Sequence, residues 1–213
     1  MGFHYRKLVR ESEWVRVYEL TDPKRFLLES KFLVDNLQVS PSAIREKWSD
    51  LSENAKVEFA SAFSSQPPRH ADDQQILQFL MEVGPEEVWR SIAIVSAFHP
   101  SVDYALQFLL ERIRQAPARR ANYYQGLELL HRAEAIPLLR QRFDEYRNMV
   151  AAKHDHADEP SFWVDYLQCT KTLWTLTRDA TFLAALKQGQ TTAPPELRSL
   201  AGLLLREVEK GKG

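Results

Sequence analysis

Residues 162–178 read FWVDYLQCTKTLWTLTR, and their apolar side chains recur at the spacing of an α-helix. The positions that follow the i, i+3, i+4, i+7 rule are Phe162, Trp163, Tyr166, Leu167, Cys169, Thr170, Leu173 and Trp174. The polar positions on the opposite side are Asp165, Gln168, Thr172 and Thr175. The stretch therefore predicts an amphipathic helix, and it places Cys169, the only cysteine, on the buried face.

The same spacing predicts helices over residues 101–115 and 134–150. A helix start is indicated where a capping residue comes shortly before a proline of the first turn. This pattern occurs at Ser40 with Pro41, at Asp158 with Pro160, and at Thr192 with Pro194 and Pro195. The last of these predicts a helix over residues 196–210. Residues 84–85 and 66–68 are predicted breaks between helices. These signals predict about eleven or twelve helices, with no strand after residue 20. Residues 1–20 fit either strands or a helix.

Four junctions share one pattern, in which a helix is followed by a short polar turn and a second apolar helix. They read YELTDPKRFLLE (18–29), SAFHPSVDYALQFL (96–109), LLHRAEAIPLLRQR (129–142) and TLTRDATFLAALKQ (175–188). The last three are spaced by roughly 33 and 45 residues, within the range of helical arrays. Single helix pairs of this kind cannot bury their apolar faces alone, so neighbouring pairs are expected to stack.

Within these junctions, HRAEAIPLLRQRF and RDATFLAALKQ resemble the second half of HEAT-type repeats, where paired leucines open the inner helix. The resemblance covers mainly residues 86–190. It implies an all-α fold, an α-α superhelix of stacked antiparallel helix pairs. We expect residues 1–213 to form a single helical-repeat domain, uncertain over 1–20 and ending in a flexible tail over 208–213. An irregular all-α bundle is the alternative.

Candidate catalytic and metal-binding residues are few. His154-Asp155-His156-Ala157-Asp158-Glu159 is rich in metal-ligand types, but two residues i and i+2 on a helix point about 200° apart, so the histidines could share a metal only in a loop. A solvated loop explains the stretch equally well, and no HExxH or CxxC pattern is present. No glycine-rich phosphate loop and no GxSxG motif occurs either. We therefore predict no catalytic residue, no metal and no cofactor.

The charge pattern is more informative than these motifs. The formal net charge is −1, which argues against strong attraction to nucleic acid. Positive charge is nevertheless concentrated in residues 101–150, which carry eight arginines. They are densest in ERIRQAPARRANYY (111–124). The predicted partner-binding residues are Arg112, Arg114, Arg119, Arg120, Tyr123 and Tyr124. We expect an exposed rim formed by Arg112, Arg119, Arg120 and Asn122. Joint replacement of its three arginines by Glu is expected to leave stability almost unchanged and to weaken partner binding. A solvated turn with Arg120 resting on Tyr124 is the alternative.

These observations favour a non-enzymatic protein-interaction module, or scaffold, with a curved helical-repeat surface and a protein partner. The alternative is an enzyme that acts on nucleic acid. HEAT-like DNA glycosylases that remove alkylated bases have about this length. The resemblance to them would assign the arginines to phosphates, Trp163 or Trp174 to the DNA, and Asp165 to the damaged base. One cysteine, an N-terminus without a signal-peptide core and the absence of a bilayer-spanning apolar run predict a cytoplasmic protein without membrane contact.

Overall fold

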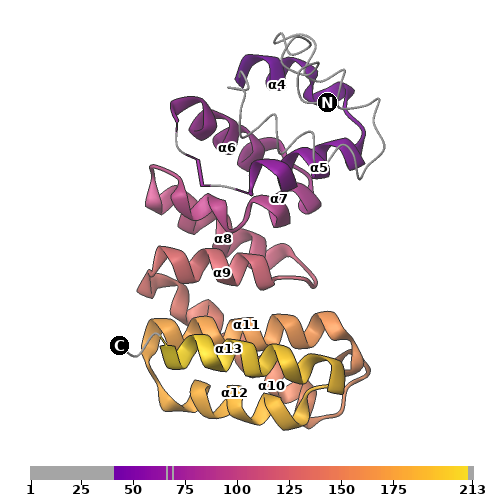
Figure 1. Cartoon of the computed structure of the whole chain (residues 1–213), viewed down its shortest axis with the longest axis vertical. Helices are drawn as coiled ribbons and strands as arrows, with labels where there is room; N and C mark the ends of the chain where they lie inside the picture. Colours follow the sequence, from indigo (N-terminus) through magenta and orange to yellow (C-terminus); the bar gives the residue numbers. More distant parts are fainter. Residues whose placement is uncertain (1–40, 66, 69, 211–213) are drawn as a thin grey trace, which may run out of the picture. The chain divides into compact units, whose positions relative to one another are not determined.

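A computed structural model describes residues 41–65, 67–68 and 70–210 of the chain (Figure 1). Within these residues the structure has ten α-helices, α4 to α13, five short 3-10 helices and no strand. The prediction of an all-α fold is confirmed at that level. The question of helix or strand over residues 1–20, and the capping role of Ser40, lie outside the described residues.

The described residues fall into two compact units, one ending at Val102 and the other beginning at Asp103. The first contains α4 (Pro41–Lys47), η1 (Trp48–Asp50), α5 (Glu53–Phe63), α6 (Ala71–Val83), α7 (Glu86–Ile92) and η2 (Val95–Phe98). Inside it, α5 packs on α7 and α6 packs on both α4 and α7. The Trp48 ring meets Phe59 and Phe79 edge-on, with centroid distances of 6.3 and 5.6 Å. Gly84 separates α6 from α7, as the Gly-Pro break predicts.

The second unit contains the helices that carry most of the predicted functional residues. They are α8 (Val102–Gln115), α9 (Ala121–Leu130), η3 (Ala133–Ala135), α10 (Ile136–Ala151), η4 (Asp155–Asp158), α11 (Pro160–Thr177), α12 (Ala180–Thr192), η5 (Pro195–Leu197) and α13 (Arg198–Lys210). Figure 1 shows α11 and α13 side by side, and α11 also packs against α9, α10 and α12.

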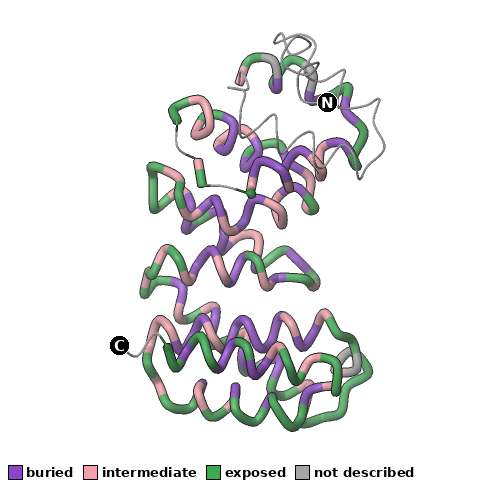
Figure 2. Tube along the Cα trace, in the orientation of Figure 1, coloured by how far each residue is buried: buried purple, intermediate pink, exposed green. Residues whose placement is uncertain are grey.

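Because α11 has neighbours on all sides, it is buried on both its apolar and its polar face. All eight residues of the predicted apolar stripe are buried. Asp165, Gln168 and Thr172, from the polar side, are buried as well. Only Pro160 among the residues of α11 is exposed, and the trace of this helix is purple or pink in Figure 2 beyond its first residue. The polar face of α11 is therefore an interior surface, which α9 covers.

Two of the repeated junctions have the same backbone geometry. His131 ends α9 and Arg178 ends α11, each in the left-handed region with φ of 51° and 56°. In both, the amide of this residue donates a hydrogen bond to the carbonyl four residues back, which is a common way to end a helix. The Arg178 guanidinium also lies 4.1 Å from the centroid of the Trp174 ring. His99, in the third junction, has extended backbone instead.

Three boundary predictions need correction. Glu159, not Asp158, is the N-cap of α11, and Thr192 is the last residue of α12 rather than a cap. The reason is that a residue directly before a proline is held in extended backbone, so Glu159 and Pro194 take the cap positions. At the other end, α13 continues through Lys210 with Val208 buried, so residues 208–210 are helical and not part of a tail.

Candidate functional site

The six arginines and tyrosines predicted to bind a partner do not share one surface. Arg114 and Arg119 are exposed and Arg112 is half-buried, whereas Arg120, Tyr123 and Tyr124 are buried. Arg120 is only 9% exposed, so the expectation that it stands at an exposed rim is wrong. The physical reason is the packing of α9 on α11, which turns Tyr123 and Tyr124 inward and takes Arg120 with them.

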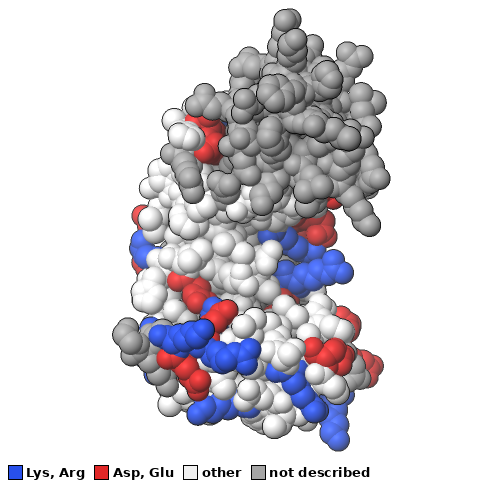
Figure 3. All heavy atoms as spheres, viewed as in Figure 1, with Lys and Arg blue, Asp and Glu red and all other residues white. Residues whose placement is uncertain are grey.

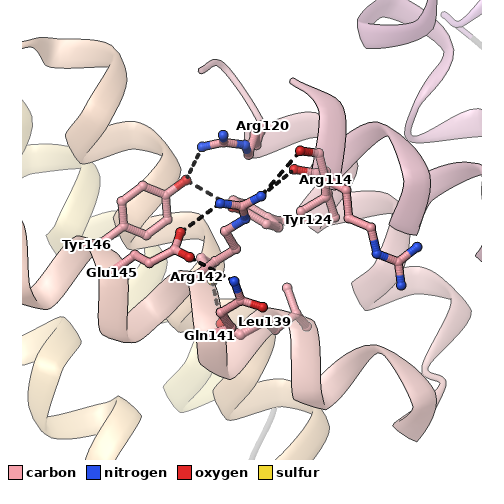
Figure 4. Close-up of polar contacts among 10 residues, drawn as sticks. Arg114, Arg120, Tyr124, Leu139, Gln141, Arg142, Glu145 and Tyr146 are labelled. Atoms are coloured by element: carbon pink, nitrogen blue, oxygen red, sulfur yellow. Dashed lines mark hydrogen bonds and ion pairs between the residues drawn. The ribbon is translucent and has the colours of Figure 1, made fainter. Parts of the chain in front are cut away.

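Arg120 belongs to a short chain of buried polar groups that Figure 4 shows. Its Nη1 donates a hydrogen bond of 3.1 Å to the Tyr146 hydroxyl, which lies 2.9 Å from the Tyr124 hydroxyl. The three residues come from the N-terminus of α9, from its first turn and from α10. A buried guanidinium and two buried hydroxyls each cost free energy unless they are hydrogen-bonded, so this chain ties α9 to α10.

Asp165, from α11, completes this cluster at the start of α9. One carboxylate oxygen accepts the Ala121 amide at 2.9 Å, and the backbone of Arg119 and Arg120 also favours the charged carboxylate and lowers its pKa. Arg119 has φ of 57°, and this left-handed residue lets successive amides converge on one anion. Since Arg120, the N-cap of α9, provides no side-chain cap, Asp165 caps this helix from a neighbouring helix.

Burial dominates the electrostatics of Asp165. It raises the pKa of this carboxyl group from 3.8 to about 6, although the backbone hydrogen bonds and the Arg120 charge act in the opposite direction. Burial also raises the pKa of Tyr146 to about 12 and that of Tyr124 well above its usual range. Both hydroxyls are therefore neutral hydrogen-bonding groups.

A second arginine, Arg142 on α10, joins the end of α8 (Figure 4). Its Nη2 donates to the carbonyl oxygens of Ile113 and Arg114 at 3.3 and 3.4 Å, and its Nη1 lies 2.7 Å from Glu145. A cation is favourable here because the last carbonyls of a helix have no intrahelical partner. The Arg114 side chain itself points away from this cluster in Figure 4.

Further along the contact between α9 and α11, polar residues of the two helices form hydrogen bonds with one another. Gln125 donates to Gln168, Gln168 donates to Glu128, and the Thr172 hydroxyl donates to the Tyr124 carbonyl at 3.2 Å. Lys171 ends this series with ion pairs to Glu128 at 3.1 Å and to Glu207 of α13 at 2.8 Å. Burial lowers the pKa of Lys171, but the two carboxylates outweigh it and the net pKa is raised.

Cys169 lies within the same interior and has no access to solvent. Its thiol is buried, lies 3.5 Å from the Leu139 carbonyl oxygen, and has a pKa that burial raises well above the usual value. A reactive thiolate needs a lowered pKa and an approach route. The interior cluster formed by Arg120, Tyr124, Tyr146, Asp165 and Cys169 is thus arranged to hold three helices together.

The stretch 154–159 forms η4 and the N-cap of α11. His154 and Asp155 are exposed, while the side chains of His156 and Asp158 are outside the description. Among the side chains that are described, no group of three or more His, Cys, Asp or Glu residues could hold a metal ion. The described part of the chain also contains no helix that is both long and apolar enough to cross a membrane.

A pocket of about 620 Å³ lies beside this stretch, between the end of α10, η4, the first turn of α11 and the α12–α13 junction. Its lining includes Lys153, His154 and Arg198 together with Val150, Trp163 and Pro194. Sequence reasoning missed this pocket, because its walls come from two stretches, residues 150–163 and 192–198, that are separated in the chain. The one local signal was the mixture of basic and aromatic residues around 153–163.

No protein-family model, no curated protein and no solved structure matches this chain.

Proposed function

We propose that this protein is a non-enzymatic, cytoplasmic interaction module whose helix pairs stack in the HEAT-like manner and present their outer surfaces to a protein partner. One observation carries the proposal. The residues best suited to chemistry, Arg120, Tyr124, Tyr146, Asp165 and Cys169, are all buried and hydrogen-bond to one another or to backbone. A group that reacts with substrate needs access to it, so these five are better suited to fixing helix positions.

The exposed surface of the second unit includes side-chain types that protein interfaces use. Arg114 and Arg119 are exposed, and so are two large apolar side chains, Leu129 at 53% and Leu203 at 46%. Arginine and apolar anchors are typical of protein interfaces. The face drawn in Figure 3 carries both acidic and basic side chains of this unit, and a protein with both charge signs is a suitable partner.

The nucleic-acid enzyme is the weaker candidate. Of the arginines that it would place on phosphates, Arg114 and Arg119 are exposed and Arg112 is half-buried. The other residues that it would bring against DNA are Arg120, Asp165, Trp163 and Trp174, and each of these is at most 9% exposed. Asp165, at 1%, is occupied by the backbone of α9. A flipped base would have to displace the N-terminus of that helix to reach the carboxylate, so the geometry favours an interaction module.

Affinity capture followed by reconstitution tests the proposal. The full chain is immobilised, proteins retained from the cytoplasm of the source cells are identified, and the complex is rebuilt from purified components. We expect a stoichiometric complex that the double variant Arg114→Glu, Arg119→Glu weakens at least tenfold without a change in its own melting temperature. The matched control replaces Arg140 and Arg147, two exposed arginines of α10, by Glu. Recovery of nucleic acid or a small molecule in place of any protein would contradict the proposal.

A further inference from the structure

The pocket beside η4 has a basic mouth and an apolar floor. Lys153 follows the last turn of α10, and Arg198 is the first residue of α13, so two cations from distant segments meet at one opening. Trp163 and Val150 supply the floor, with Pro194 beside them. None of the described side chains that line the pocket is acidic. Such a lining is complementary to an anion attached to an apolar group.

No described carboxylate pairs with either cation of the pocket. Within the described part of the chain, neither Lys153 nor Arg198 forms an ion pair, whereas the nearby interior cations Arg142 and Lys171 each have carboxylate partners. The Nε of Arg198 donates to the Ala193 carbonyl at 3.0 Å. This hydrogen bond fixes the guanidinium at the α12–α13 junction and leaves its terminal nitrogens for an external acceptor.

The floor is held in place in the same way. The Trp163 indole donates to the Ala157 carbonyl at 2.7 Å, which connects the first turn of α11 to η4. Its ring also meets Phe162 and Tyr166 within the core, so its orientation is determined by packing. Because this aromatic wall is already ordered, little conformational entropy is lost from it when a ligand binds in the pocket.

We propose that this pocket binds the C-terminal carboxylate of a partner polypeptide whose last residues are apolar. The carboxylate lies between Lys153 and Arg198, and the last side chain packs against Trp163 and Pro194. This inference rests on the proposed function, because it names a chemical feature of the partner. Capture of a terminal carboxylate is one of the recurring ways in which proteins recognise peptides.

Two features favour a chain end over other anions. Lys153, His154 and Arg198 are all exposed, so the pocket is open, and an open pocket covers too little of a small molecule to bind it tightly. A peptide end can enter while the rest of its chain runs outward. Acidic residues also flank the lining in the sequence: Asp155, Glu159 and Glu196 are exposed. These carboxylates repel a partner segment with several acidic side chains. A partner whose last residues are apolar brings only its terminal carboxylate and is repelled less.

Synthetic peptides provide the test. The probes are dye-labelled hexapeptides that begin Gly-Ser-Gly-Ser and end in two residues drawn from Val, Leu, Ile and Phe, with either a free carboxylate or a C-terminal amide. We expect fluorescence polarisation to detect binding of at least one free acid to the full chain. Its amide should bind at least tenfold more weakly, and the affinity of the acid should fall as salt rises.

The variant Lys153→Asn, Arg198→Gln removes both charges. Asparagine is chosen because Lys153 has φ of 50°, which asparagine tolerates. The matched control is Lys187→Gln, Arg206→Gln, on exposed positions of α12 and α13 outside the pocket. We expect the first variant to lose the difference between acid and amide and the control to keep it, with unchanged melting temperatures in both.

The inference is overturned if acids and amides bind equally well, or if no peptide binds at millimolar concentration. It is also overturned if 3-phenylpropionate displaces the best peptide at an equal or lower concentration than the unlabelled peptide does, because the pocket then takes a small carboxylate. Failure of the inference is distinguishable from failure of the proposed function. A captured partner that binds the Lys153→Asn, Arg198→Gln variant normally contradicts the pocket alone, whereas peptide binding without any captured partner contradicts the function alone.

Discussion

At the scale of single residues, Asp165 makes stability depend on pH. Its pKa rises from 3.8 to about 6 on folding, so between these values the folded chain binds the proton more readily than the unfolded chain. The stabilisation that this causes is fully present below about pH 4 and is lost as pH rises through 6, amounting to roughly 3 kcal/mol. We expect Asp165→Asn to remove this fall in the free energy of unfolding, measured by urea denaturation between pH 4 and 7.

The matched control for that measurement is Asp144→Asn, at an exposed position of α10. It should reproduce the pH dependence of the unchanged chain. If the fall between pH 4 and 6 persists in Asp165→Asn, another group causes it and the raised pKa of Asp165 is contradicted. Asp165→Ala, which leaves the Ala121 amide at the start of α9 without its acceptor, should destabilise at every pH by about 1–3 kcal/mol.

Arg120 and Arg119 are neighbours in the chain, but we expect their replacement by Glu to change the free energy of unfolding by very different amounts. Arg120→Glu puts a negative charge beside Asp165 and breaks the hydrogen bond to Tyr146, so we expect a loss of about 3 kcal/mol or more in the free energy of unfolding. Arg119→Glu changes an exposed side chain and should shift stability by less than about 0.5 kcal/mol. Urea midpoints at pH 7 provide the comparison.

This prediction replaces the expectation that Arg112, Arg119 and Arg120 could all become Glu without destabilising the domain. Any joint change that includes Arg120 should be destabilising, so a partner-binding test must leave Arg120 in place. Equal midpoints for Arg120→Glu and Arg119→Glu would show that the Arg120 contacts contribute nothing to stability.

At the scale of elements, the close packing of α12 on α11 depends on Gly189. A Cβ at this position would come within 2.7 Å of the Leu167 Cδ2 atom, and because Leu167 is buried, any shift of this methyl group disturbs the core. At Gly202 of α13 the nearest atom would be the Gln190 amide nitrogen, 3.3 Å away on a flexible side chain. We expect Gly189→Ala to destabilise by about 1–3 kcal/mol through overpacking.

Gly202→Ala is the matched control, and there the better helix propensity of alanine should stabilise by up to about 1 kcal/mol. Thermal unfolding followed by circular dichroism measures both changes. The same sign of shift for the two variants would contradict the close approach of α12 to α11 at Gly189.

The elements also show what the sequence could and could not predict. Helical spacing identified α8, α10 and α11 and every buried apolar residue of α11. It could not reveal that Asp165, Gln168 and Thr172 are buried too, because a polar side chain indicates solvent unless the neighbouring helix is known. Asp165 is internal because its carboxylate accepts the Ala121 amide at the start of α9. The pocket was missed for the same reason, since Lys153, Trp163 and Arg198 meet only in the folded chain.

At the scale of the whole molecule, the second unit contains everything that a separate domain requires. Its core surrounds α11, which packs against four helices of the same unit, and Arg142 fixes the end of α8 within it. Helix α8 begins at Val102, so a fragment of residues 100–213 keeps this helix whole. We expect this fragment to be soluble, helical by circular dichroism, and cooperative in urea, with Asp165→Asn changing its pH dependence as in the full chain.

A cooperative transition of the fragment at the same urea concentration as in the full chain would mean that the second unit draws little stability from the rest of the protein. A lower midpoint would measure how much the first 99 residues contribute. A fragment without cooperative unfolding would contradict the expectation of an independent unit. It would support instead the prediction of a single domain over residues 1–213, because stacked helix pairs stabilise one another through their nearest neighbours and the removal of several pairs unfolds those that remain.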